Sequence, residues 1–280
     1  MANIIINHLR YYLYMKQNTD DIIDKDDGKK RLTYITVAFN QPQYIEYQIR
    51  LISKFESNSY HHWILDNSSD KQYSDDIRNI CCKYGNVSYV RIPQKCKWYK
   101  NSMSHAMALN WFHNKILVHK NHLYSIFLDH DIFPIAKITF SQYLEKQGIY
   151  GVYQERIDSG RTYWYLWPGL CGLSNKYLKD LDFRGTKWGD TGSSSFETIY
   201  KHISPENIKF SQESVFRMTD GAREYAEKPD EWRKDAERFL EEAVEIYDDE
   251  WIHMVNGSNW ANRPINKKQE FLFQYLDNLL

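Results

Sequence analysis

Residues 124–131 read Tyr-Ser-Ile-Phe-Leu-Asp-His-Asp, and this stretch decides the fold. A short uncharged run rich in large apolar side chains is typical of a buried strand, and here it passes directly into Asp129, His130 and Asp131. Two carboxylates two residues apart at a strand end can bind Mg²⁺ or Mn²⁺ in one cleft, and such an ion can bridge a diphosphate. The alternative is that the two acids only cap a turn. His130 is expected to leave the opposite face of the strand.

Three strand-and-helix units precede this stretch. The predicted strands are residues 32–39, 61–65 and 87–92, and the helices that follow them are residues 45–55, 73–84 and 102–115. Alternating strands and helices are typical of an α/β fold with a central mixed, mostly parallel sheet flanked by helices. Polar residues such as Asn40 and residues 66–70 close the strands, and open α/β sheets bind ligands at the carboxyl ends of their strands.

The rest of the chain is less regular. The further elements that we expect are strands at 151–154 and 163–167 and helices at 175–181, 195–202 and 229–247. Residues 1–31 form a predicted helical extension before a single domain at 32–280. The apolar stripe of this extension comprises Ile4, Ile5, Leu9, Tyr12 and Leu13. We expect the stripe to pack on the domain, on a second copy of the chain in a homodimer, or on a membrane surface.

The composition excludes some classes of function. The chain has 280 residues, with 36 basic and 37 acidic side chains and a formal net charge of −1, so it offers no basic field that could hold a nucleic acid. The four cysteines form no Cys-x-x-Cys pair, which argues against a zinc site or a disulfide framework. Neither a secretory signal nor a run of about 18 apolar residues stands out, and we therefore expect a cytoplasmic protein without a transmembrane segment.

The polar strand ends resemble those of a known family. The resemblance is to the nucleotide-sugar half of GT-A fold glycosyltransferases, most closely family 2, and it is carried in chain order by Asn40, residues 66–68, the polar helix start at 101–105, and Asp129 with Asp131. It implies a GT-A-like, Rossmann-like sheet. Residues 32–135 would form the nucleotide-sugar-binding half and residues 136–280 the acceptor-binding half. Neither common Gly-rich phosphate loop occurs in the sequence, so the phosphates need a metal.

The same resemblance assigns roles within the donor half. The residues implied to bind the donor are Asn40, Asp66, Asn101, His105 and Asp129, and those implied to bind the metal are Asp129 and Asp131. Of these donor residues, Asn40 and Asp66 would hold the nucleoside.

An inverting transferase also needs a carboxylate that removes the proton of the acceptor hydroxyl while the sugar is attacked. Asp190 falls where family 2 enzymes place a catalytic acid within a Glu-Asp pair, although Gly189 stands here in place of the first acid. A helix N-cap or a loop turn is the alternative role for Asp190. Glu155 and Glu213 are reserve candidates for the base.

Residues 251–260 resemble a late segment of several GT-A enzymes, in which a histidine completes the metal site and a loop closes over the diphosphate. His253 would be the third protein ligand of the metal, and Ser258, Asn259 and Trp260 would contact the donor. Imidazole suits Mn²⁺ better than Mg²⁺, so manganese is the expected ion and magnesium the second choice. The alternative is a structural histidine half-buried between two tryptophans.

Aromatic residues make up 16% of the chain, and several in the second half are candidates for the acceptor site. They are Tyr153, Trp164, Tyr165 and Trp167, followed by the turn at residues 168–172. Aromatic faces beside glycines let a sugar ring stack closely, and core packing is the alternative.

These observations predict a metal-dependent glycosyltransferase that moves a sugar from a nucleotide-diphosphate sugar, by family resemblance a UDP-sugar, to a carbohydrate hydroxyl with inversion. One rival is a nucleotidyltransferase of related topology, which normally carries a Gly-rich basic loop that is not present near Asn40. The other rival is a non-catalytic carbohydrate-binding protein, which would explain the aromatic residues but not the ordered polar strand ends.

Overall fold

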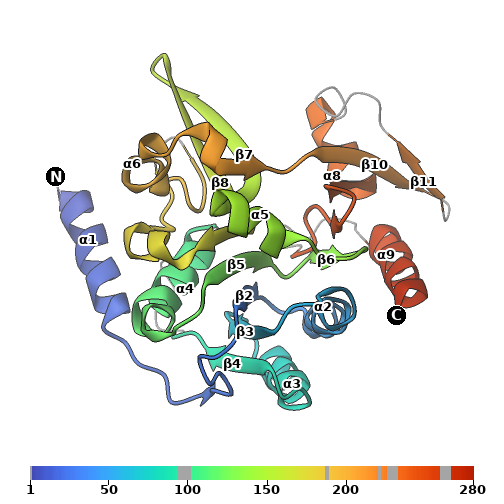
Figure 1. Cartoon of the computed structure of the whole chain (residues 1–280), viewed down its shortest axis with the longest axis horizontal. Coiled ribbons are helices and arrows are strands. Elements are labelled where there is room, and N and C mark those ends of the chain that lie inside the picture. Colours follow the sequence, from blue (N-terminus) through green and yellow to red (C-terminus); the bar gives the residue numbers. More distant parts are fainter. Residues whose placement is uncertain (1, 94–101, 187–188, 220–221, 226–232, 259–265) are drawn as a thin grey trace.

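The computed structural model describes residues 2–93, 102–186, 189–219, 222–225, 233–258 and 266–280. Within these residues the chain forms an eight-stranded sheet with helices on both faces and a five-stranded sheet beside it (Figure 1). The mixed, mostly parallel α/β fold class predicted from the sequence is therefore confirmed. None of the described helices is long and apolar enough to cross a membrane.

The large sheet has the strand order β1-β4-β3-β2-β5-β8-β7-β9. Its strands are β1 (Ile22–Ile23), β2 (Leu32–Ala38), β3 (Tyr60–Asp66), β4 (Val87–Arg91), β5 (Tyr124–Asp129), β7 (Ile149–Asp158), β8 (Arg161–Ser174) and β9 (Ile208–Phe210). The strands β4, β3, β2 and β5 are parallel, and they match the four predicted strands to within one residue at each end. The pairs β1–β4, β5–β8 and β7–β8 are antiparallel.

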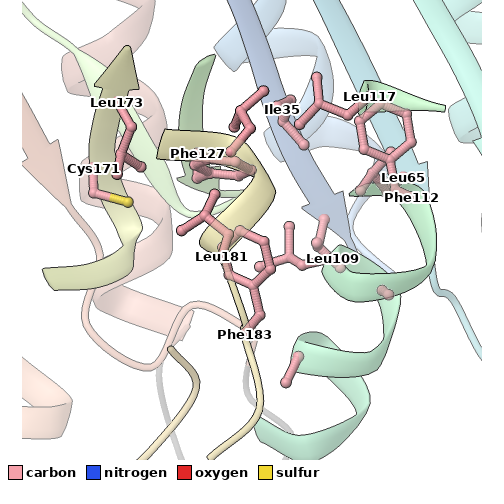
Figure 2. Close-up of a cluster of buried hydrophobic side chains, with 14 of the residues drawn as sticks. Ile35, Leu65, Leu109, Phe112, Leu117, Phe127, Cys171, Leu173, Leu181 and Phe183 are labelled. Atoms are coloured by element: carbon pink, nitrogen blue, oxygen red, sulfur yellow. The ribbon is translucent and has the colours of Figure 1, made fainter. Parts of the chain in front are cut away.

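Helices cover both faces of the parallel strands because both faces are apolar. The described helices around the large sheet are α1 (Ala2–Met15), α2 (Pro42–Phe55), α3 (Lys71–Cys82), α4 (Ser102–Lys115), α5 (Phe140–Gln147) and α6 (Ser195–Thr198). The short 3-10 turns are η1 (Leu117–His119), η2 (Asn175–Asp180), η3 (Tyr200–His202) and η4 (Pro205–Asn207). On one face Ile35 and Phe127 pack with Phe112 of α4 (Figure 2). On the other face Ala38 packs with Ile45 of α2.

The smaller sheet is antiparallel and has the strand order β11-β10-β12-β13-β6. Its strands and the two helices near it are β6 (Ile132–Pro134), β10 (Glu213–Thr219), β11 (Ala222–Tyr225), α8 (Ala236–Glu242), β12 (Ala243–Tyr247), β13 (Trp251–His253) and α9 (Asn266–Leu279). One face of this sheet packs with α2 and α9 in a single apolar cluster.

The helix predicted over residues 229–247 is wrong after Glu242, where the chain turns into β12. Val244 and Ile246 point into the cluster with α2 and α9, whereas Glu245 and Tyr247 point to the other face of the sheet. Pairing with β10 on one side and β13 on the other satisfies the backbone of this segment and overrides its helical spacing of apolar residues.

The strand order creates a switch point between β2 and β5, because the chain moves from β2 to β3 on one side and later returns to β5 on the other. Open α/β sheets form a ligand-binding crevice at such a point. The register sets Asp129 beside Val37 and Asp66 beside Ala38. The predicted gathering of polar strand ends at one edge of the sheet is therefore confirmed.

The N-terminal helix α1 packs on the apolar core of the large sheet through Tyr11, Tyr14 and Met15, which do not belong to the predicted stripe. Tyr14 is 3% exposed, and Tyr11 and Met15 pack against the same core cluster. By contrast, Leu9, Tyr12 and Leu13 of the predicted stripe are each at least half exposed. These three residues therefore do not pack on the large-sheet core, and packing of the stripe on a second copy or a membrane surface stays a prediction.

A buried ion pair fastens the segment after α1 to the large sheet. The Asp26 carboxylate accepts hydrogen bonds from Nε2 of His122 at 2.8 Å and from the indole of Trp63 at 3.1 Å. Nδ1 of His122 donates to the carbonyl of Lys30 at 2.9 Å. Because both ring nitrogens face acceptors, the site favours the imidazolium form. Burial lowers the pKa of His122, but the hydrogen bonds outweigh this effect and raise the pKa. Burial raises the pKa of Asp26, but its hydrogen bonds, among them the one from His122, lower the pKa.

We predict that His122→Phe destabilises the protein by about 3 kcal/mol near pH 5.5, since it leaves a buried carboxylate without its partner. The raised pKa of His122 contributes stability below about pH 6.5 that is lost as the pH rises through the folded-state pKa. The lowered pKa of Asp26 contributes stability that is lost only in acid. Urea unfolding at pH 5.5 and 8.5 should therefore show a smaller difference from wild type at pH 8.5. The exposed His119→Phe is the control, and an equal difference at both pH values would contradict the prediction.

Candidate active site

The two predicted carboxylates lie where β5 turns into β6. Asp129 ends β5 and is half-buried, and Asp131 directly precedes β6 and is 5% exposed. The buried Gln48 of α2 shapes this turn, because its Nε2 donates to the carbonyls of Asp129 at 2.9 Å and Ile132 at 2.8 Å. Thr36 of β2 in turn donates to Oε1 of Gln48 at 2.7 Å. The turn is thus fixed by hydrogen bonds from the neighbouring strand and helix.

His130 points away from the two carboxylates, as predicted. Its Nδ1 donates to the carbonyl of Val37 at 3.1 Å, and its ring stacks against Tyr44 with centroids 6.0 Å apart. His130 therefore serves the packing of the turn against β2 and α2.

His253 is brought next to Asp131 by the smaller sheet. β13 pairs with β6, which sets His253 opposite Ile132, and the amide of Met254 donates to the Asp131 carbonyl at 2.9 Å. Nε2 of His253 lies 3.7 Å from Oδ1 of Asp131. This distance is too long for a hydrogen bond, but two ligands of one ion, each about 2.1 Å from it, lie roughly 3 to 4 Å apart.

The other ring nitrogen of His253 is engaged by an acid. Nδ1 of His253 lies 2.7 Å from Oε2 of the buried Glu245, and the hydroxyl of Tyr247 donates to the same oxygen at 2.5 Å. Burial raises the pKa of Glu245, but the bond and charge of His253 and the charge of Arg233 lower it to about 2. Burial lowers the pKa of His253, but Glu245 and Asp131 raise it.

The loop after β13 presses its backbone on Asp131. A Cβ atom at Gly257 would lie 2.5 Å from Cβ and 2.7 Å from Oδ2 of Asp131, so only glycine fits there without movement. The buried Lys268 of α9 secures the start of this loop by donating to the carbonyl of Val255 at 2.7 Å, and it also donates to the carbonyls of Leu240 and Ala243. Burial lowers the pKa of Lys268 to about 8.

The residues present fit a metal that is shared with a substrate. Among the residues that the structure describes, no group of three His, Cys, Asp or Glu side chains is arranged to hold an ion. The separation of His253 Nε2 and Asp131 Oδ1 nevertheless suits one ion. Divalent ions in enzymes commonly take one or two carboxylates together with phosphate oxygens and water. Asp131 and His253 can therefore hold an ion whose other ligands come from a diphosphate and from water.

The two predicted nucleoside residues are both engaged in the loops that end β2 and β3. Asn40 has a left-handed backbone (φ 53°), and its side chain exchanges two hydrogen bonds with Ser69. Asp66 is fully buried and accepts hydrogen bonds from Ser74, Tyr89, Arg91 and the amide of Ser68. Asp66 therefore orders the strand ends, and contact of either residue with a nucleoside stays a prediction.

The remaining predicted donor residues are only partly described. His105 of α4 places Nε2 3.3 Å from Oδ1 of Asp129. Burial raises the pKa of Asp129, an effect that His105 opposes and Asp131 reinforces. Ser258 follows Gly257 directly and is half-buried. Asn101, Asn259 and Trp260, whose contacts with the donor stay predictions, lie outside the described residues.

Asp190, the predicted base, is exposed in the turn before α6, where its carboxylate accepts from the amide of Thr191 at 2.7 Å. The structure leaves little room for a side chain at Gly189, where family 2 enzymes are expected to carry an acid. A Cβ atom at Gly189 would lie 2.5 Å from that of Ser193 and 3.2 Å from the ring of Tyr165. The reserve acids are engaged elsewhere, Glu155 with Tyr153 and Glu213 with Arg233.

One of the aromatic residues predicted for the acceptor site, Trp167, lies beside His253, a candidate metal ligand. The indole of Trp167 is 4.8 Å from the ring of His253 between centroids, and it occupies the space that a side chain at Gly169 would need. Tyr165 is buried and accepts from the amide of Asp190 at 3.2 Å. Tyr153 and Trp164 stack on one another on the β7–β8 hairpin, at 5.8 Å.

The sequence analysis missed Gln48, Glu245 and Lys268. Gln48 follows Ile45 by three residues within the apolar stripe of α2. A polar residue in such a stripe indicates a buried side chain with hydrogen-bond partners, so Gln48 could have been found from the sequence. Glu245 was hidden by its assignment to a helix, since its role depends on β12 being a strand beside β13. No pattern in the sequence distinguishes Lys268 from an ordinary helix lysine.

Comparisons with known proteins complete this description. No protein-family model and no curated protein matches the sequence. Solved structures that resemble the chain are GT-A type glycosyltransferases. They include the mannosyltransferase PcManGT from Pyrobaculum calidifontis in complex with GDP-Man and Mn²⁺, with 13% identity and a TM-score of 0.48 over 85% of this chain and 68% of that chain. The mannosyltransferase Ktr4p from S. cerevisiae has 14% identity and a TM-score of 0.39 over 70% of this chain and 75% of that chain. Similarity at these values does not establish a function, and we therefore infer the function from the residues of this chain.

We predict that Gly257→Ala displaces the Asp131 carboxylate and weakens Mn²⁺ binding in the presence of a nucleoside diphosphate by at least about tenfold, the loss typical of a disturbed metal ligand. Isothermal titration calorimetry measures the effect. Gly85→Ala is the matched control, because a Cβ atom there meets nothing within 4 Å. Equal Mn²⁺ affinity in both variants would show that the close approach at Gly257 is irrelevant to the ion.

Proposed function

We propose that this chain is a metal-dependent glycosyltransferase that moves a sugar from a nucleotide-diphosphate sugar to a hydroxyl of a carbohydrate acceptor. The proposed donor is a UDP-sugar, the proposed ion is Mn²⁺, with Mg²⁺ as the second choice, and the proposed outcome is inversion. The observation that carries the proposal is the meeting of Asp131 and His253 beside Asp129, at the switch point of the large sheet. A crevice at that point is where open α/β sheets receive nucleotides.

Each residue at the switch point has a proposed task. Asp131 and His253 hold the ion, and His105 orients Asp129 toward the donor side of the crevice. Asn40 and the loop ordered by Asp66 form the nucleoside end. When bound, a divalent ion supplies positive charge that stabilises the departing diphosphate.

The acceptor hydroxyl needs a base, and Asp190 is the proposed one. It is exposed, so its carboxylate can meet an acceptor, and Tyr165 holds its backbone amide. Trp167, whose ring is tilted against that of His253, offers an aromatic face beside the proposed ion. This arrangement supports a sugar that is held beside the proposed ion ligands Asp131 and His253.

A metal-binding pair also suits a nucleotidyltransferase, and the aromatic residues also suit a carbohydrate-binding protein. Nucleotide release from UDP-, GDP- and dTDP-sugars separates the three hypotheses. A glycosyltransferase releases the nucleoside diphosphate, a nucleotidyltransferase instead makes pyrophosphate from a nucleoside triphosphate and a sugar phosphate, and a binding protein releases neither. Release of no nucleoside diphosphate from any donor, with a panel of glycan acceptors, would exclude the proposed reaction.

We predict that Asp131→Asn removes most of the Mn²⁺-dependent part of UDP binding, with a loss above about 100-fold, because an amide is a weaker ligand than a carboxylate. Calorimetry with UDP, with and without Mn²⁺, measures the metal-dependent part. Asp75→Asn is the control, because it removes the same charge from an exposed pair with Lys71. Unchanged Mn²⁺-dependent binding in Asp131→Asn would refute the metal assignment.

We predict that Asp190→Asn binds donor and Mn²⁺ normally but transfers sugar about 100-fold or more slowly, since general-base catalysis typically contributes 10²- to 10⁴-fold. The rate of acceptor-dependent nucleotide release checks this. Asp180→Asn, at the end of η2, is a surface control. Near-normal turnover would remove Asp190 from the mechanism and return attention to Glu155 and Glu213.

A further inference from the structure

We propose that Glu245 is a positioning residue that fixes His253 as a metal ligand, and this inference rests on the function proposed above. Glu245 is the direct cross-strand partner of His253 in the β12–β13 ladder, and both side chains lie on the same face of the smaller sheet. Oε2 of Glu245 lies 2.7 Å from Nδ1 of His253, while Nε2 of the same ring faces Asp131 at 3.7 Å. One end of the imidazole is therefore held by Glu245, and the other end is directed to the ion site.

The contact selects one tautomer of the neutral ring. A carboxylate can only accept a hydrogen bond, so the proton must reside on Nδ1. The lone pair is then on Nε2, which is the atom that faces Asp131. Metal-binding histidines commonly donate their second N–H to a carboxylate, which fixes the ring orientation and increases the basicity of the ligating nitrogen.

Glu245 is itself held in place by two further side chains. Tyr247 donates to Oε2 at 2.5 Å, and Arg233 donates to Oε1 at 2.8 Å. Arg233 also pairs with Glu213 of β10. Glu245 is 7% exposed, so water has little access to its carboxylate. A rigidly held acceptor keeps the imidazole in one plane, which is what a directional ligand needs.

The packing around the pair supports the same role. Trp167 lies against the His253 ring at 4.8 Å between centroids, and the Tyr247 ring is stacked at 6.5 Å. These aromatic groups restrict rotation of the imidazole, whereas Glu245 determines which nitrogen carries the proton. The two effects can be separated by substitution.

The first test measures metal affinity, not activity. In Glu245→Gln a neutral amide of nearly the same shape replaces the carboxylate, and we expect Mn²⁺ affinity with UDP present to fall 10- to 100-fold. Free Mn²⁺ is counted by its electron paramagnetic resonance signal. Glu242→Gln is the matched control. It lies three residues from Glu245 along the chain and removes the same charge, but from a surface ion pair with Arg238. Tyr247→Phe, which keeps the carboxylate, should cause a smaller loss than Glu245→Gln.

The second test reads the His253 ring in the metal-free protein. ¹⁵N nuclear magnetic resonance, with the signal assigned through His253→Gln, distinguishes the two tautomers at a pH where the ring is neutral. We expect the Nδ1–H form in wild type and an increased share of the Nε2–H form in Glu245→Gln. A residue that only stabilised the fold would leave the tautomer unchanged.

The outcomes separate this inference from the proposed function. A wild type that binds Mn²⁺ with UDP, together with a Glu245→Gln variant of equal affinity and the same tautomer, overturns the positioning role and leaves the proposed function intact. A wild type that does not bind Mn²⁺ with any nucleoside diphosphate overturns both. Weaker Mn²⁺ binding with a changed tautomer supports both.

Discussion

The candidate site depends on the pairing of β6 with β13. Only three residues from each strand form this ladder, yet it sets His253 opposite Ile132 and is continued by the bond from Met254 to the Asp131 carbonyl. Successive side chains of a strand point to opposite faces, so a slip of one residue would turn His253 into the apolar cluster and Ile252 toward Asp131. The apolar cluster that contains Ile252, Phe133 and Met254 therefore fixes the register of the site as well as the stability of the sheet.

Helix α2 connects this small sheet to the large one. Ile45 and Ile49 pack under the large sheet, whereas Tyr44 and Leu51 pack under the smaller sheet. Gln48 lies between these two sets and binds the carbonyls of the turn that joins β5 to β6. The carboxylates of that turn consequently keep a fixed orientation to both sheets, which is what a site assembled from distant parts of the chain requires.

The sequence predicted the parallel half of the fold well because that half has a simple physical code. Residues 32–38, 60–66, 87–91 and 124–129 are mostly apolar or β-branched stretches that polar residues close or soon follow, and buried parallel strands have this pattern. Asp129 and Asp131 could be found in this way because they directly follow such a run. The smaller sheet could not, since β12 has apolar residues at positions that also suit a helix, and only its long-range pairing decides between the two. Glu245, whose role depends on this pairing, was missed for the same reason.

Two buried aspartates differ in how their carboxylates are held, and the difference bears on the role proposed for Asp131. Asp66 is completely buried and its carboxylate receives four hydrogen bonds, including one from Arg91 at 2.7 Å, so its charge is compensated within the protein. Asp131 is also buried, but its oxygen lies 3.7 Å from His253, beyond hydrogen-bond distance, and the backbone of Gly257 presses on its other side. Burying a carboxylate under such conditions costs free energy that well-packed apolar residues would not. Asp66 recovers that free energy through its four hydrogen bonds, whereas Asp131 would recover it through the cation that we propose to lie between Asp131 and His253.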